Sequence, residues 1–110
     1  LEAFWGQKKN FIREEPKYDY AEIDFWAQSR VDEAMRAEVC ASFQNWRQEI
    51  EAMLARFAGH LSEGKRKMLA AVMVSMMEGA SMQYLLQPDA FDLDEYFAYC
   101  TELVLKETGR

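Results

Sequence analysis

The chain has 110 residues, of which half are hydrophobic and 29% are charged. This balance is typical of a folded globular domain and excludes a disordered segment. The formal net charge of -6 argues against a nucleic-acid-binding surface on these residues, because phosphate neutralisation requires clustered Lys and Arg. Only five Gly and two Pro interrupt a sequence rich in helix-forming residues, so we expect a single all-α domain with long helices.

The first expected helix begins at Leu1 and must end before Pro16, because the residue that precedes a proline is disfavoured in the α conformation. Its apolar face, which has Lys8 in its midst, consists of Leu1, Phe4, Trp5, Phe11 and Ile12. A short second helix is expected to end near residues 29–30. Asp19 is its predicted N-cap, and Glu22 would complete a capping box.

The third and longest helix is expected to run from an N-cap at Asp32 to a left-handed stop at Gly59. Apolar residues recur along it in alternating steps of four and three: Val39, Phe43, Trp46, Ile50, Met53, Phe57 and Leu61. That stripe should face a core.

The fourth helix should begin at the N-cap Ser62 and end near Leu86, just before Pro88. The fifth has the clearest start, because Asp92 can cap it and Glu95 can close a capping box. Its apolar stripe consists of Leu93, Tyr96, Phe97, Cys100, Leu103 and Val104.

The segment MLAAVMVSMMEGASMQYLL, residues 68–86, carries only one charge, Glu78, and is nearly long enough to span a bilayer. We reject a membrane span because polar residues are scattered through it and amphipathic helices flank it. Its apolar arc is wider than the roughly 100° that one core face requires. Part of that arc should therefore stay exposed in the subunit and mark an interaction site.

Two sides of this helix can be distinguished on a helical wheel. One side holds Met68, Val72, Ser75, Gly79 and Leu86, and the adjoining side holds Leu69, Met73, Met76, Met77, Ala80 and Tyr84. The small residues Ala71, Ser75 and Gly79 allow another helix to approach closely, either from the same chain or from a second copy. Five of the seven Met residues lie in this helix, as core filler or as the adaptable wall of a dimer seam or ligand site.

The sequence contains no recognisable catalytic or metal-binding pattern. His60 is the only histidine, no Cys/His cluster has zinc spacing, and no phosphate-binding glycine motif occurs. Cys40 and Cys100 are predicted to be free thiols of a reducing cytoplasm. We expect no enzymatic activity, no metal and no cofactor.

Aromatic and Met side chains of adjoining helices are candidates to line an apolar ligand pocket, with a plain aromatic core as the alternative. The pocket candidates are Tyr20, Phe25, Trp26, Phe43, Trp46, Met53 and Met76.

Two segments resemble the regulatory domain of TetR (tetracycline-repressor) family transcriptional regulators. The segment at residues 24–54, DFWAQSRVDEAMRAEVCASFQNWRQEIEAML, is similar to the middle of that domain at Trp26, Asp32-Glu33, Arg36, Phe43, Trp46 and Arg47. The segment at residues 77–97, MEGASMQYLLQPDAFDLDEYF, is similar to its penultimate helix end and last helix at Glu78-Gly79, Pro88-Asp89 and Phe91-Asp92-Leu93.

This resemblance implies a helical bundle of about five helices that binds a small hydrophobic effector, either apolar or amphipathic. It also implies a homodimer, in which the last two long helices of each subunit form a four-helix interface. The dimer candidates on those helices are Met73, Met77, Ala80, Tyr84, Leu93, Phe97, Cys100 and Val104.

The family's N-terminal helix-turn-helix is absent from residues 1–110, and Leu1 already belongs to an expected helix. We therefore expect DNA to be contacted only by an N-terminal domain outside these residues, in the cytoplasm and away from membranes. The alternative is a purely structural helical dimerisation module that binds no ligand and has a filled aromatic core.

Overall fold

Five α-helices build the domain, as expected from the sequence. The computed structural model describes residues 1–109, apart from the side chain of Glu2. Within that range the helices are α1 (Glu2–Glu14), α2 (Pro16–Gln28), α3 (Glu33–Phe57), α4 (Glu63–Leu86) and α5 (Leu93–Glu107). The described chain contains no strand, which confirms the all-α prediction.

The three predicted N-caps of the long helices are confirmed. Asp32, Ser62 and Asp92 each accept a hydrogen bond from the backbone N–H three residues further on, at 3.0, 3.1 and 2.9 Å. These bonds satisfy donors that would otherwise lack an intrahelical partner. Local side-chain chemistry therefore fixes where α3, α4 and α5 begin.

Two other predicted boundaries are wrong. Helix α2 begins at Pro16, whose fixed φ suits the first helical position, so Asp19 lies inside the helix and is buried rather than acting as a cap. Helix α3 ends at Phe57, and Ala58 donates its N–H to the carbonyl of Leu54. Gly59 does not adopt a positive φ, so the chain leaves α3 without a left-handed residue.

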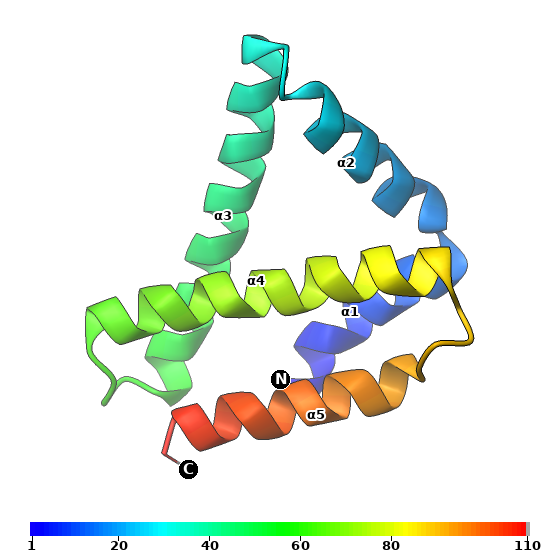
Figure 1. Ribbon diagram of the computed structural model, residues 1–110. Helices are drawn as coiled ribbons and strands as arrows, with labels where there is room; N and C mark the ends of the chain where they lie inside the picture. Colours follow the sequence, from blue (N-terminus) through cyan, green and yellow to red (C-terminus); the bar gives the residue numbers. More distant parts are fainter. Residues whose placement is uncertain (110) are drawn as a thin grey trace.

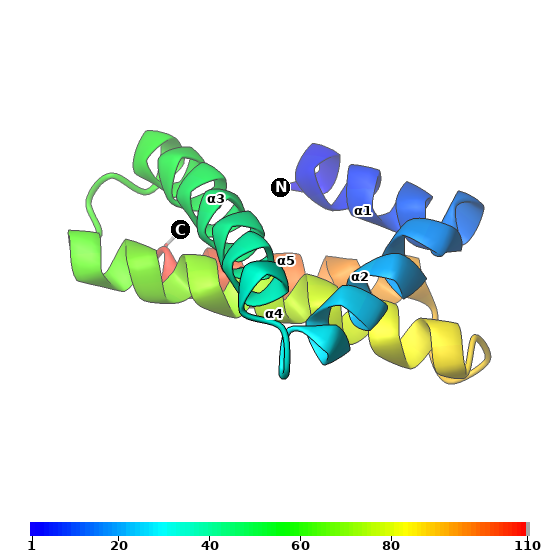
Figure 2. The same ribbon diagram turned by 90° about the horizontal axis from the view of Figure 1, so that it is seen from above.

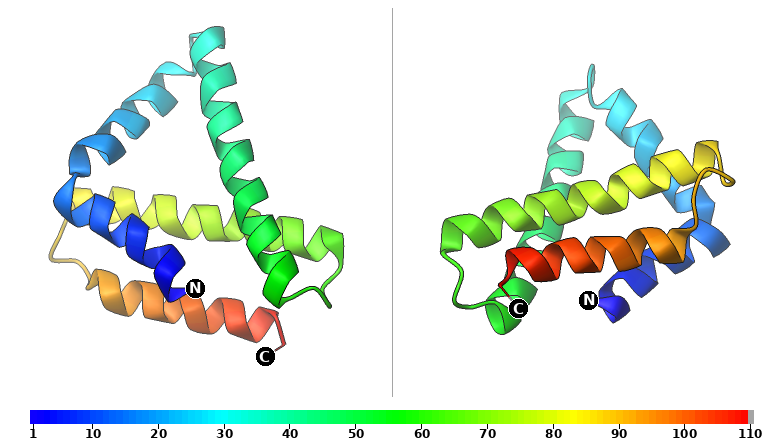
Figure 3. Two further views of the ribbon diagram at one scale, coloured as in Figure 1. Left: turned by 180° about the vertical axis from the view of Figure 1, so that it is seen from behind. Right: turned by 60° about the horizontal axis from the view of Figure 1, so that its bottom comes forward.

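Helix α4 is the centre of the fold and packs against each of the other four helices. Helices α4 and α5 lie side by side in one layer. Helices α1 and α3 form a second layer that covers one face of the first (Figures 2 and 3). The shortest extent of the molecule, 17 Å, agrees with two helical layers about 8–10 Å apart.

Helix α2 and the first half of α3 lean together and project away from α4 (Figure 1). The radius of gyration, 14.8 Å, exceeds the roughly 13 Å of a compact chain of this length for that reason. Large apolar side chains are exposed on this arm, with Trp26 at 62% and Val31 at 83%. The predicted core stripe of α3 is fully buried at Ile50 and only partly buried elsewhere.

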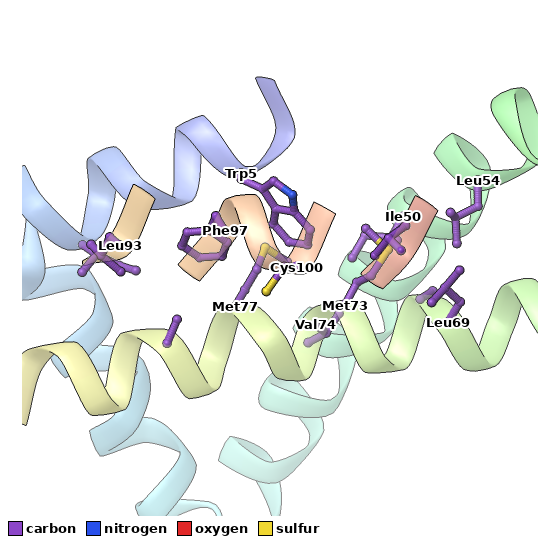
Figure 4. Close-up of a cluster of buried hydrophobic side chains, with 14 residues drawn as sticks. Trp5, Ile50, Leu54, Leu69, Met73, Val74, Met77, Leu93, Phe97 and Cys100 are labelled. Carbon is purple, nitrogen blue, oxygen red and sulfur yellow. The ribbon is translucent and has the colours of Figure 1, made fainter. Parts of the chain in front are cut away.

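The core is formed where α1, α3 and α5 meet α4. Trp5 of α1 stacks on Phe97 of α5 at 5.2 Å between ring centroids, and its indole N–H donates to Thr101 Oγ1 at 2.8 Å. Met77 of α4 lies next to this pair, and Ile50 of α3 fills the crossing of α3 and α4 (Figure 4). The buried apolar cluster thus joins the two layers.

Helix α4 is long and apolar enough to cross a membrane by length and composition alone. That criterion is weak evidence, because the core helix of a soluble protein also satisfies it. The packing of α4 against four other helices accounts for the apolar character of its inward face.

The side chains that the sequence placed at a dimer interface on α4 and α5 pack mostly inside the subunit. Seven of the eight dimer candidates are at most 3% exposed inside the subunit, and Tyr84 is half-buried: the seven are Met73, Met77, Ala80, Leu93, Phe97, Cys100 and Val104. The outward face instead carries Met68, Val72, Met82 and Leu86 of α4 with Tyr99 and Leu103 of α5. A helical wheel gives the angle between two faces but not which of them points inward.

We expect Val104→Ala to lower the free energy of unfolding by about 2–3 kcal/mol, because Val104 is fully buried and its two lost methyl groups leave a cavity. The matched control is Val31→Ala in the exposed α2–α3 turn, which should change stability by less than about 0.5 kcal/mol. Urea denaturation followed by circular dichroism measures both. Equal effects of the two substitutions would contradict the placement of the core.

Candidate functional site

A cavity of about 610 Å³ lies between α1, α2, α3 and α4. One part of its lining is aromatic or apolar: Phe4, Phe11, Tyr18, Trp46 and Met77. The other part is polar and mainly acidic: Gln7, Lys8, Glu15, Asp19, Glu22 and Glu49. The cavity thus combines ring surfaces with an excess of carboxyl groups.

Of the seven predicted pocket residues, only Trp46 lines this cavity. Trp26 and Phe43 line a separate depression of about 270 Å³ between α2 and α3. Tyr20 lines another, of about 340 Å³, beside the end of α4.

The other three pocket candidates are also dispersed. Phe25 is about half exposed on α2, whereas Met53 and Met76 pack against the buried core. The structure therefore does not bring the seven predicted side chains together, because α2 projects from the body instead of folding back over it.

Helix α1 supplies the cavity residues that sequence reasoning missed. Phe4, Lys8 and Phe11 all line the cavity from this helix. A signal was present in the sequence: Lys8 is a charged residue in the middle of an otherwise apolar face. Such a residue needs a buried partner, and its partner is the misassigned Asp19.

The Lys8 ammonium is the centre of a network that joins four helices. Its Nζ lies 2.7 Å from Asp19 Oδ1 of α2 and 3.7 Å from Glu78 Oε1 of α4. It also lies 5.4 Å from the ring centroid of Trp46 of α3, within the range of a cation–π contact. The hydroxyl of Ser81 on α4 donates to the same Asp19 oxygen at 2.7 Å.

The network is buried but not fully satisfied. The side chains of Lys8 and Asp19 are 9% and 4% exposed, so their charges are largely removed from water. Among the described residues, Asp19 Oδ2 and Glu78 Oε1 have no hydrogen-bond partner. The 3.7 Å contact between Lys8 and Glu78 is an ionic contact but too long for a hydrogen bond.

Burial raises the pKa of Glu78 to about 7, and the nearby negative charge of Glu22 adds to this increase while the Lys8 ammonium opposes it. Glu78 is therefore partly protonated at neutral pH. The cluster contains one ammonium and the carboxyl groups of Asp19, Glu22 and Glu78. Its net charge is negative whenever two or more of these carboxyls are ionised.

The far side of α1 is attached to α5. Asp94, in the first turn of α5, lies 2.9 Å from Lys9 Nζ and 3.1 Å from Arg13 Nη2. The hydrogen bonds from these two side chains lower the pKa of Asp94. Together with the Trp5 bond to Thr101, they hold α1 between the cavity and α5.

We expect Asp19→Asn to destabilise the domain by about 3–5 kcal/mol, because it leaves the buried Lys8 ammonium without its short ionic partner. Asp24→Asn is the matched control, since Asp24 is exposed on the same helix, and it should cost less than about 0.5 kcal/mol. Both values come from denaturant unfolding. A small effect of Asp19→Asn would show that the ion pair is not a structural requirement.

Comparison with protein-family models gives one match, to the BetI-type transcriptional repressor, C-terminal, over residues 20–108. No curated protein and no solved structure matches the chain. The family match covers most of the chain, from α2 to the end of α5, and it agrees with the resemblance in the sequence. The chain therefore belongs to the TetR family of transcriptional regulators, as a C-terminal domain of the BetI type.

Proposed function

We propose that this domain is the effector-sensing part of a transcriptional regulator and that its effector binds in the cavity between α1, α2, α3 and α4. The observation that carries the proposal is the joint lining of this cavity by aromatic rings and by the Lys8–carboxylate network. Its volume of about 610 Å³ lies within the usual range for small-molecule sites, about 300–1,000 Å³.

The lining favours an amphipathic effector, one of the two kinds, apolar or amphipathic, that were expected from the sequence. Phe4, Phe11 and Trp46 offer surface to an apolar group. The carboxyls of Asp19 and Glu22 favour a hydrogen-bond donor or a positive charge at the other end of the molecule.

A homodimer through the outward face of α4 and α5 is the second part of the proposal. Met68, Val72, Met82 and Leu86 stand on that face of α4, the last of them 82% exposed. Exposed apolar side chains concentrated on one helix face are typical of a protein–protein contact. Gly79 on the same helix has no atom of the subunit within 4 Å of an added Cβ, so a partner helix could approach closely there.

Helix α1 is the element through which effector binding would act. It lines the cavity with Lys8 and contacts α5 through Trp5, Lys9 and Arg13. An effector that binds one placement of α1 more tightly would shift the population toward that placement. We further propose that DNA is bound by a domain outside these residues and that the regulator acts in the cytoplasm.

A purely structural dimerisation module is the less favoured alternative, because such a module would have a filled core. Burying Lys8, Asp19 and Glu78 beside a cavity costs solvation free energy, and apolar side chains of similar volume would fill the core of a ligand-free module without that cost.

To test the effector site, a library of amphipathic compounds with and without a positive charge would be screened by thermal melting. A compound at about 100 times its Kd should stabilise the domain by about 2.7 kcal/mol. Trp46→Ala should abolish the shift, and its own cost should be below about 3 kcal/mol because one side of the ring already faces the cavity.

The matched control is Trp26→Ala, since Trp26 is exposed in a different depression and should leave the thermal shift intact. If no compound stabilises the domain, or if both Trp variants respond like the unsubstituted chain, the effector proposal fails.

Gly79→Leu tests the dimer. A Cβ added at Gly79 meets nothing outside its own helix backbone within 4 Å, and the substitution removes the helix penalty of glycine, about 0.8–1 kcal/mol, so the subunit should stay folded. It should nevertheless convert the dimer to a monomer in light scattering at concentrations on the order of tens of micromolar. Gly64→Leu, at the start of the same helix, also has open space and should leave the dimer intact. A monomeric unsubstituted chain would refute the proposed dimer.

A further inference from the structure

We propose that Glu78, in the buried network around Lys8, is a proton-binding group, which makes the attachment of α1 to α2 and α4 depend on pH near neutrality. The proton site itself needs no effector. Only its regulatory meaning rests on the proposed function, because Glu78 contacts Lys8, which lines the effector cavity.

The first argument is the imbalance of charge around Lys8. Its ammonium is 2.7 Å from Asp19 and 3.7 Å from Glu78, and Glu22 lines the same cavity. Asp19 receives both the short contact with Lys8 and the hydrogen bond from Ser81, so it is the carboxyl whose charge is best compensated.

Glu22 and Glu78 then have little compensation left. The side chain of Glu78 is 21% exposed, and its Oε1 accepts no hydrogen bond from the described residues. Two ionised carboxylates in such a place would repel each other with limited screening by water. Binding of one proton by Glu78 removes that repulsion and leaves Asp19 as the ionised partner of Lys8.

The surrounding helices supply no second cation among the residues that line the cavity. The charged side chains there are Lys8 from α1, Glu15 at the α1–α2 junction, Asp19 and Glu22 from α2, and Glu49 from α3. On α5, Tyr96 donates its hydroxyl to the Met76 carbonyl, and burial raises its pKa to about 12, so it stays protonated. Lys9 and Arg13 are directed to Asp94.

The direction of the pH effect follows from the raised pKa of Glu78, about 7 against an ordinary 4.5. The folded state binds this proton more tightly than the unfolded chain, so the associated stability is fully present below the ordinary pKa. It is lost as the pH rises through about 7. Above that pH, Glu78 would compete with Asp19 for Lys8 and loosen the junction of α1, α2 and α4.

A direct test follows the glutamate carboxyl carbons of the whole 110-residue chain by NMR during a pH titration, without any ligand. One resonance should titrate near pH 7, and it should be missing in Glu78→Gln. Glu22→Gln should move that titration to lower pH, because it removes the neighbouring negative charge. If every glutamate titrates below about pH 5.5, the proposal is refuted.

A second readout is the melting temperature, which should fall on the order of 5 °C between about pH 5.5 and about pH 8.5. Glu78→Gln should remove most of this fall and melt higher than the unsubstituted chain at the upper pH. Glu38→Gln, at an exposed position of α3, is the matched control and should keep the full fall. An unchanged fall in Glu78→Gln would overturn the proposal even if the effector experiments succeed, because neither measurement contains an effector.

Discussion

The buried ion pair between Lys8 and Asp19 is the interaction on which the arrangement of the helices depends. It joins α1 to α2 across a charge pair largely removed from water, and Ser81 extends it to α4 through the same oxygen. Such a pair is costly to bury and more costly to break, so it specifies one register of the three helices. Because this pair fixes α1 relative to α2, it also holds in place the side chains of both helices that line the cavity.

The two faces of α4 make different contacts. Its inward face, with Met73 and Met77, completes the core together with Trp5 and Phe97. Its outward face remains apolar although no helix of the described chain covers it, which is why we assign a second copy to it. An apolar arc wider than one core face thus reflects two contacts, one inside the subunit and one proposed between subunits.

Helix α1 connects features that are distant in the sequence. Trp5 and Arg13 contact α5, whereas Lys8 faces the cavity. A displacement of α1 would therefore change both its contacts with α5 and the lining of the cavity. The acidic excess around Lys8 gives the same junction a dependence on protonation. Effector binding and proton binding would then act on one structural element, a short helix that precedes the residues matched by the family.

The sequence by itself determined the helix content, the starts of α3, α4 and α5, and the family, because capping residues, apolar periodicity and motif order are local properties. It also contained the site's two signals, Lys8 on an apolar face and Glu78 as the sole charge of the apolar segment at residues 68–86. Only the tertiary structure decided that Lys8 meets both Asp19 and Glu78, that α2 projects with Phe25 and Trp26 exposed, and which face of α4 points inward. Those outcomes depend on how helices cross in space, and no periodicity along one chain segment encodes a crossing.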